Sequence, residues 1–491
     1  MKYQPGEGFW SERVSQVMRK MIPLQLSILK DQEPDTEPSH AIENMKIAAG
    51  LAEGEFHGMV FQDSDIGKWI EAASYSLMIS PDPALEEEID SIVEIIGKAQ
   101  RPDGYLNTWF TLKEPEKRWT NLQDCHELYC FGHLTEGAIA YHQATGKTAF
   151  LDIMRRMADH IMTVIGPEEG KLHGYPGHPE AELALYRLYL ETGEGKYLQL
   201  SKYFVDQRGT SPNFFEEEWE RRGGISHWSH KKEPINLEYY QAHKPVREQE
   251  EAVGHAVRAL YLYTGMACLA AETGDSALAE ACERLWKNAV ERKMYVTGGL
   301  GATARGEAFM GNEELPNDTA YAETCASVAL CFFGRAMNRL KRDGRIGDAM
   351  ERALYNTVLA GVSLKADRFF YVNPLEVVQG VSGVQQGLEH VVPARPRWYA
   401  CACCPPNVAR LITSLQEYAC QEQGDDILVH LFVDGTVECE KARLTLRTEY
   451  PWDGRMEWKA ETKGKVNLLL RLRDGRKRRR LNFPSMGRIC P

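Results

Sequence analysis

The sequence predicts a mainly α protein in which paired helices form a solenoid or a closed toroid, followed by a small β region. From about residue 10 to residue 420, apolar residues return at steps of three and four, which is the helical period. The same helix-to-helix turn recurs along this stretch. After about residue 422 the pattern changes to short runs of alternating apolar and polar residues, which are typical of strands.

The recurring turn has a glycine directly after a helix: Thr145-Gly146, Thr192-Gly193, Thr273-Gly274 and, more loosely, Asp343-Gly344. Glycine adopts the left-handed cap at low cost, so each of these predicts a tight turn between two helices. Repeated helical hairpins favour a solenoid or a toroid. Other connections between the predicted helices are long: 101–125, 208–248, 295–318 and 364–402. Loops of this length inside a compact domain usually carry function.

The C-terminal pattern predicts a β-hairpin of 427–433 and 436–439 around Asp434-Gly435, with further strands at 443–450, 456–462 and 466–472. We therefore expect a helical domain over 1–421 and an incomplete β region over 422–491. The basic run at 476–480 is interpreted as a solvated tail.

Composition excludes several classes of partner. Hydrophobic residues make up 43% of the 491 residues, and the net charge of −12 offers no basic footprint for nucleic acid or an anionic membrane. No apolar run approaches the ~20 residues of a membrane span. The first ten residues contain no apolar signal-peptide core, so we expect a cytoplasmic protein. The sequence leaves a homodimer open.

Most of the twelve cysteines are scattered singly in apolar helical patterns. Four of them are interpreted as small buried hydrophobes: Cys268, Cys282, Cys331 and Cys420. The segment Cys401-Ala-Cys403-Cys404-Pro405-Pro406-Asn407 differs. Vicinal cysteines rarely bond to each other, and two prolines suit the first turn of a helix. Cys403 and Cys404 are therefore predicted at a helix N-terminus, where the helix dipole favours thiolates.

A second cysteine motif is Glu323-Thr-Cys325, after a predicted helix start at 315–318. Residues two positions apart face opposite sides of a regular helix, so Glu323 and Cys325 could share a metal only if the first turn of the helix were distorted. The sequence alone does not predict such a distortion. The alternative is a core cysteine beside a surface glutamate. With Cys403 and Cys404 the motif makes three thiols and a carboxylate, a set that suits tetrahedral zinc.

Glu307 follows a glycine-rich loop and is a candidate acid/base, the alternative being an exposed loop carboxylate. Four histidines lie near predicted helix starts or in loops, and in a toroid they could converge on one rim; individually each fits a structural role. They are His126, His133, His178 and His255. Trp109, Trp228 and Trp398 suit stacking on sugar faces.

Taken together, these motifs resemble those of glycoside hydrolase family 127, the β-L-arabinofuranosidases, over nearly the whole chain. The matching segments are Gly306-Glu-Ala-Phe, Leu315-Pro-Asn, Glu323-Thr-Cys, Cys401-Ala-Cys-Cys-Pro-Pro-Asn, His126-Glu-Leu-Tyr, Gly177-His, Gly254-His and Phe370-Tyr-Val-Asn-Pro. The sequence departs from the family after 472, where a basic stretch replaces the usual β continuation, so we expect a truncated β region.

The resemblance implies an (α/α)6 barrel followed by β-sandwich material. It implies a retaining enzyme that releases L-arabinofuranose from β-L-arabinofuranosides in an oligosaccharide or glycoconjugate. The implied roles are zinc binding by Glu323, Cys325, Cys403 and Cys404, nucleophilic attack by Cys403, acid/base catalysis by Glu307, and substrate binding by His126, His178, His255 and Tyr371.

Two other classes of function remain open at this point. One is another carbohydrate enzyme on a helical toroid, a uronide hydrolase or a lyase, which would need basic residues for the uronate. The other is a non-catalytic glycan-binding protein with structural zinc, because closed sites with four protein ligands are normally structural.

Overall fold

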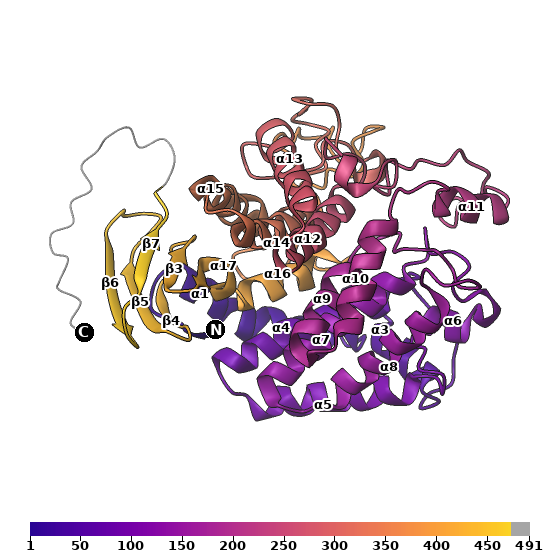
Figure 1. Ribbon diagram of the computed structural model, residues 1–491, viewed down its shortest axis with the longest axis horizontal. Coiled ribbons are helices and arrows are strands. Elements are labelled where there is room, and N and C mark those ends of the chain that lie inside the picture. Colours follow the sequence, from indigo (N-terminus) through magenta and orange to yellow (C-terminus); the bar gives the residue numbers. More distant parts are fainter. Residues whose placement is uncertain (473–491) are drawn as a thin grey trace.

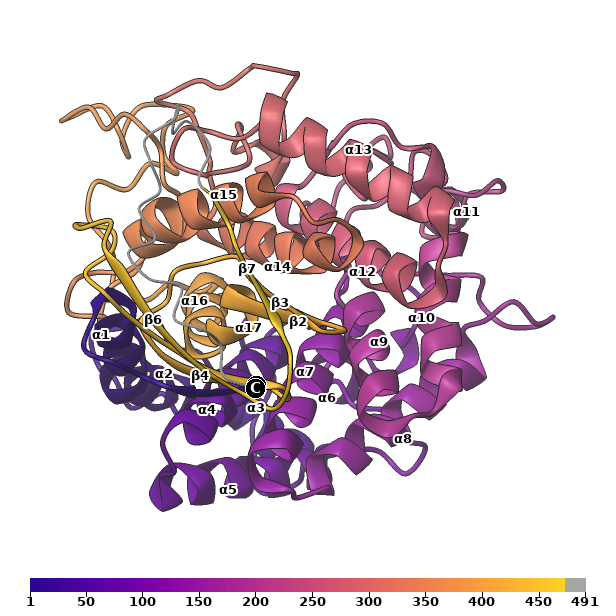
Figure 2. The ribbon, with the colours of Figure 1, turned by 60° about the vertical axis from the view of Figure 1, so that its left-hand side comes forward.

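The computed structural model describes residues 1–472. Within these residues, six helices form a closed inner ring, in which each contacts the next along the chain and the last contacts the first. Figure 2 shows them around the middle of the molecule. They are α4 (Asp63–Ile79), α7 (Glu127–Thr145), α9 (Ala181–Thr192), α12 (Ala256–Thr273), α14 (Thr324–Leu340) and α16 (Cys404–Thr413). The ring closes because α4, α7 and α12 are buried on nearly every side.

A second layer of amphipathic helices covers the ring. It comprises α1 (Phe9–Gln16), α2 (Ile22–Leu29), α5 (Pro83–Ala99), α8 (Ala149–Val164), α10 (Gly195–Gln207), α13 (Ser276–Arg292) and α15 (Gly344–Ala353). A π-helical turn at Val17–Met21 joins α1 to α2, and α15 continues into another at Leu354–Val358. Five of these pack on the inner helix that directly precedes them in the chain. The prediction of an (α/α)6 barrel is therefore confirmed, and the open solenoid is not what forms.

Three of the four predicted turns have the expected geometry. Gly146, Gly193 and Gly274 end their helices with φ of 74°, 72° and 70°. Gly344 differs, because it is the first residue of α15 and Asp343 caps that helix by accepting a hydrogen bond from the Arg345 N–H.

The long connections also contain structure that the sequence analysis left out. Two short helices lie in them, α6 (Thr108–Leu112) and α11 (Phe214–Arg221), and each is capped by the asparagine before it. A further helix, α3 (Ala41–Ala48), follows α2, and α17 (Gln416–Ala419) follows α16.

The strands form two sheets. One has the order β1-β4-β5-β6 and is antiparallel; its strands are β1 (Lys2–Gln4), β4 (Gly435–Glu438), β5 (Ala442–Thr448) and β6 (Met456–Thr462). The other has the order β2-β3-β7, with β2 (Cys420–Gln423) antiparallel and β7 (Asn467–Leu470) parallel to β3 (Asp426–Val429). The predicted hairpin around Asp434-Gly435 is wrong, because β3 and β4 belong to different sheets.

Asp434 explains why no hairpin forms here, because its side chain binds the N-terminal segment of the chain instead of forming a turn. Its carboxylate accepts hydrogen bonds from the N–H groups of Gly8 (2.7 Å), Trp10 (3.0 Å) and Ser11 (3.2 Å). At Gly435, with φ of 108°, a Cβ would lie 2.5 Å from the carbonyl oxygen of Gln4. The chain therefore passes straight from Asp434 into pairing with β1. The basic run at 476–480 lies outside the described residues.

The β region packs at the barrel end where the inner helices finish. Arg342, just beyond the end of α14, forms an ion pair with Asp426 (2.6 Å), and the Gln423 amide donates to the carbonyl oxygen of Asn338 (3.3 Å). Figure 1 shows the strands on the left and the connections with α6 and α11 on the right. The β region does not cover the opposite end, where the inner helices begin, so a functional site can lie there. Within residues 1–472, none of the helices combines the length and apolarity needed to cross a bilayer.

We expect Asp434→Ala to lower the free energy of unfolding by about 3 kcal/mol or more, since it leaves several buried N–H donors unpaired at ~1–3 kcal/mol each. Denaturant unfolding would measure this. The matched control is Asp425→Ala, which removes an exposed ion pair with Lys441 (2.8 Å) and should cost less than ~1 kcal/mol. Equal losses in the two variants would contradict the role assigned to Asp434.

Candidate active site

The starts of the inner helices bring the predicted site residues together. His126 precedes α7, His255 precedes α12, Glu323 precedes α14 and Cys403 precedes α16, each as the N-cap residue. The N-terminus of a helix carries a partial positive charge, which stabilises thiolates and carboxylates. The prediction that Cys403 and Cys404 lie at a helix start with two prolines in its first turn is confirmed.

The four predicted metal ligands form one cluster, in which a ligand atom of each lies within 4.8 Å of the others. The Cys325 sulfur is 3.4 Å from that of Cys403 and 3.2 Å from that of Cys404, and these two are 3.8 Å apart. Glu323 Oε1 is 3.5 Å from the Cys403 sulfur. A disulfide would need about 2.05 Å. Tetrahedral zinc, with Zn–S bonds of ~2.3 Å, places sulfurs ~3.8 Å apart and sulfur and oxygen ~3.5 Å apart, close to this spacing.

The backbone before α14 resolves the spacing problem of Glu323 and Cys325. Glu323 has φ −58° and ψ 136°, so it is not helical, and its side chain can turn to the same side as Cys325. The predicted helix start at 315–318 is wrong, because α14 begins only at Thr324. The residues before it are instead tied to the segment around Tyr371: the Thr324 N–H donates to the Tyr371 carbonyl (2.8 Å), and the Asn373 amide donates to that of Ala322 (3.0 Å).

The charge balance of the cluster favours a cation. Burial raises the pKa of Glu323, Cys325 and Cys404 well above their ordinary values. Hydrogen bonds from Cys325, Cys401 and Cys404 hold the pKa of Cys403 well below that of an ordinary thiol. Cys403 is therefore the sulfur whose thiolate form the neighbouring side chains stabilise. Glu323 Oε2 is also buried without a hydrogen-bond partner. A soft divalent cation would complete the site and allow all four donors to be deprotonated.

Glu307 is held at the edge of this cluster by a strained loop. Gly306 and Glu307 both have positive φ, 72° and 52°, and Ala308 bridges to His255. Glu307 Oε2 lies 3.0 Å from His255 Nε2, and the Tyr321 hydroxyl donates to Oε1 (3.0 Å). Burial alone would raise the pKa of Glu307, but the hydrogen bonds of His255 and Tyr321 bring it below its ordinary value. A carboxylate oxygen of Glu307 also lies within 4.8 Å of one of Glu323.

Three histidine rings form a continuous row beside Glu307. The ring centres of His126 and His178 are 5.6 Å apart, and those of His178 and His255 are 5.7 Å apart. Burial lowers the pKa of His126 and His178 well below the ordinary value, so both rings are neutral. Their Nδ1 atoms lie against the carbonyl oxygens of Asp124 (2.6 Å) and Pro179 (2.9 Å). Nδ1 must therefore carry the proton, and Nε2 remains an acceptor suited to hydroxyl groups.

His255 is the opposite tautomer. Its Nδ1 accepts hydrogen bonds from the backbone N–H groups of Val257 (3.2 Å) and Arg258 (3.4 Å), so Nε2 carries the proton and donates to Glu307. His133 does not join the row, because it is fully buried within α7, where Nδ1 lies 3.2 Å from Glu180.

Other predicted side chains lie beside the cluster and the histidine row. The Tyr371 hydroxyl is 3.7 Å from the Cys401 sulfur, which lies beside the cluster. Trp228 is 45% exposed and its ring is 5.7 Å from that of His126, so it offers a stacking face, whereas Trp398 is buried against Tyr399. Cys268, Cys282, Cys331 and Cys420 are buried as predicted.

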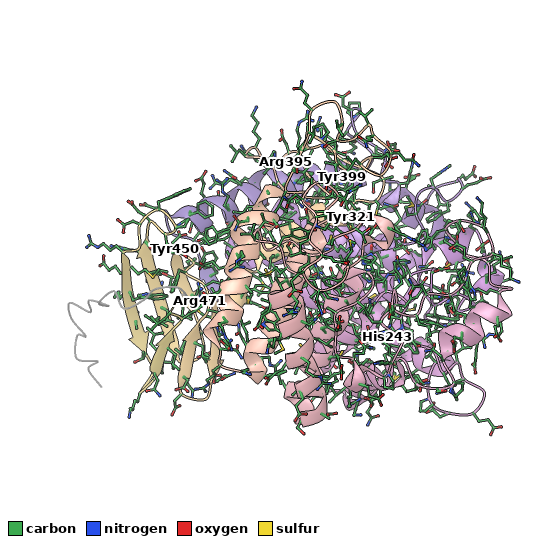
Figure 3. The ribbon with its side chains drawn as sticks, turned by 90° about the horizontal axis from the view of Figure 1, so that it is seen from above. His243, Tyr321, Arg395, Tyr399, Tyr450 and Arg471 are labelled. Atoms are coloured by element: carbon green, nitrogen blue, oxygen red, sulfur yellow. The ribbon has the colours of Figure 1, made fainter. Side chains whose placement is uncertain are left out.

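Tyr321 is a site residue that was not predicted from the sequence, where its proximity to the Glu323 motif was the only signal. Figure 3 shows Tyr321 and Tyr399 among loops away from the strands, where Tyr450 and Arg471 lie.

Comparisons with known proteins agree with this geometry. Residues 5–417 match the family model described as "Beta-L-arabinofuranosidase, GH127 catalytic domain". A non-reducing end β-L-arabinofuranosidase of Bifidobacterium longum subsp. longum is 43% identical over 471 residues, covering 92% of this chain and 71% of that protein.

Two solved structures are similar throughout. A GH127 β-L-arabinofuranosidase from Geobacillus stearothermophilus T6 is 50% identical, with a TM-score of 0.93 over 96% of this chain and 75% of that one. A GH127 β-arabinofuranosidase is 38% identical, with a TM-score of 0.83 over 96% of this chain and 70% of that one. These matches favour this family over the two alternatives that the sequence left open, a uronide hydrolase or lyase and a non-catalytic glycan-binding protein. The chain belongs to glycoside hydrolase family 127 and is a glycoside hydrolase.

Proposed function

We propose that this protein releases L-arabinofuranose from the non-reducing end of β-L-arabinofuranosides with retention of configuration. The names of its relatives support the substrate. The observation that carries the mechanism is the cluster of Cys325, Cys403 and Cys404 with Glu323, placed beside Glu307 at the end of the barrel where the inner helices begin.

Zinc is the cofactor that this donor set fits best, with Glu323, Cys325, Cys403 and Cys404 as ligands. Three sulfurs and one carboxylate oxygen at tetrahedral spacing suit zinc better than a metal that prefers oxygen ligands. When bound, it would supply the positive charge that keeps the thiols deprotonated and their sulfurs fixed.

In the proposed reaction, the Cys403 thiolate attacks the anomeric carbon and forms a C–S bond as the glycosidic C–O bond breaks. Glu307 gives its proton to the departing oxygen. In the second half, Glu307 takes a proton from water, the water oxygen attacks the same carbon, and the C–S bond breaks to restore the thiolate. Two inversions at one carbon give net retention. His126 and His178 accept hydrogen bonds from sugar hydroxyls through Nε2, and Tyr371 closes the pocket beside Cys401.

The pKa of Glu307 has a different effect on each of the two half-reactions. The hydrogen bonds of His255 and Tyr321, which lower its pKa, favour the carboxylate that acts as a base. The acid of the first half needs a higher pKa. Expulsion of water by a bound sugar would raise it, because a charged carboxylate loses solvation when it is enclosed.

The purified protein is expected to contain about one zinc ion per chain. Cys325→Ala should lose most of it, since it removes one of the four ligands. The matched control is Cys331→Ala, which removes a buried cysteine of the same helix, α14, and should keep its zinc. Elemental analysis by mass spectrometry measures both. Active protein free of metal would refute the zinc site.

Glu307→Gln is expected to keep the metal and the fold but to lose ~10²–10⁴-fold in the hydrolysis of substrates with poor leaving groups. Aryl arabinofuranosides with activated leaving groups should suffer less in the first half-reaction, because the departing oxygen needs less protonation. Steady-state and single-turnover kinetics separate the halves. Glu313→Gln, in the same loop but exposed, should behave like wild type. Wild-type rates on both substrate kinds in Glu307→Gln would exclude this role.

A sugar-like epoxide or haloacetamide is expected to label Cys403, because Cys403 is half-buried whereas Cys325 and Cys404 are 1% exposed. Mass spectrometry of the peptide spanning 398–410 locates the adduct. Cys403→Ser should be inactive, whereas Cys401→Ser, outside the proposed ligand set, should retain activity. An adduct on Cys404 alone, or an active Cys403→Ser, would show that the nucleophile has been misassigned.

A further inference from the structure

Asn407 ends the Cys401–Asn407 motif and has no role in the mechanism above. It lies one turn beyond Cys403 and Cys404 on α16 and is 1% exposed. Its side chain crosses from α16 to the neighbouring helix α14, where Nδ2 lies 3.1 Å from the Cys325 sulfur. An amide N–H therefore points at one of the three sulfurs of the cluster.

The surroundings of Asn407 determine which end of the amide faces the sulfur. Its Oδ1 accepts hydrogen bonds from Arg410 Nε (2.8 Å) and from the Tyr261 hydroxyl (3.2 Å). Arginine can only donate, so the oxygen must lie on that side and the NH2 group must face Cys325.

Arg410 is itself held in place. It donates to Glu71 (2.9 Å) and to the Tyr261 hydroxyl (3.0 Å). Arg410, Tyr261 and Glu71 are at most 3% exposed. A fully buried chain of hydrogen bonds therefore fixes the direction of the Asn407 N–H.

The three sulfurs consequently differ in their environments. A hydrogen bond to a thiolate draws electron density from sulfur, which makes it a weaker nucleophile and holds its position. Cys325 receives such a bond from Asn407 and is 1% exposed. Within residues 1–472, the partners of the Cys403 sulfur are the Glu323 carboxylate and the thiols of three cysteines: Cys325, Cys401 and Cys404. Thiols are weak donors, and no nitrogen donor is among these partners. The amide thus distinguishes a sulfur that stays bound from one that reacts.

We propose that Asn407 is a positioning residue that fixes Cys325 as the permanent metal ligand and leaves Cys403 as the thiolate that reacts. This proposal rests on the proposed function, since it assigns a division of labour among the sulfurs of that site. Outer-shell hydrogen bonds of this kind typically change metal affinity ~10–100-fold when they are removed.

The test uses full-length protein stripped of metal and titrated with Co²⁺, whose sulfur-to-cobalt charge-transfer band reports on the thiolates. In Asn407→Leu, cobalt affinity should fall ~10–100-fold and the band should move to longer wavelength, because the sulfur lone pairs rise in energy without the N–H. Asn407→Asp keeps an oxygen acceptor for Arg410 and removes the donor, so it should show the same changes even if the leucine variant fails to fold.

The matched control is Asn338→Leu. Asn338 is equally buried on α14, and its Nδ2 lies 3.8 Å from the Met350 sulfur, far along the helix from the cluster. It should leave both cobalt readouts unchanged. Wild-type affinity and spectrum in Asn407→Asp, or equal changes in Asn338→Leu, would overturn the role of Asn407 alone. A wild-type protein that binds no cobalt would overturn the proposed function as well.

Discussion

The closed ring of inner helices is the constraint on which the rest of the molecule depends, because it brings every inner N-terminus to one end of the barrel. Partial positive charges that converge in a small space need anionic or strongly accepting groups nearby. Cys403, Glu323 and the histidines at 126 and 255 occupy those positions. The architecture that closes the core therefore also places a helix N-terminus beside Cys403, the thiol of the cluster whose pKa is lowered.

Beneath this mouth the barrel axis is polar, and its charges are paired in a buried network. Arg410 contacts Glu71 and lies 3.8 Å from Glu180, and Arg187 pairs with Glu136. Burying such charges is costly unless each is matched, so the network adds little net stability but tolerates few alternative arrangements. Arg410 links this network to the cluster through Asn407. The position of one thiol on α14 thus depends on contacts that extend into the centre of the ring.

At the other end, the β region is joined to the first residues of the chain. Asp434 accepts hydrogen bonds from the segment that opens α1, and β1 pairs with β4. Segments more than 400 residues apart in sequence are therefore adjacent. These contacts lie at the barrel end opposite the cluster, which separates the elements that complete the fold from those that carry the chemistry.

The sequence by itself determined the helical hairpins, since the 3.6-residue period and the glycines after α7, α9 and α12 are local properties. It also identified the cysteine and glutamate motifs, because rare residue types beside two prolines stand out without any coordinates. Only the tertiary structure decided the non-helical turn at Glu323, the sheet partner of β4, and the contacts of Tyr321 and Asn407. Each of these depends on a residue far away in the chain: Tyr371 opposite Thr324, Gln4 opposite Gly435, Glu307 opposite Tyr321, and Cys325 opposite Asn407. Local patterns contain no information about such pairings, because they form only when the ring closes and the strands pair.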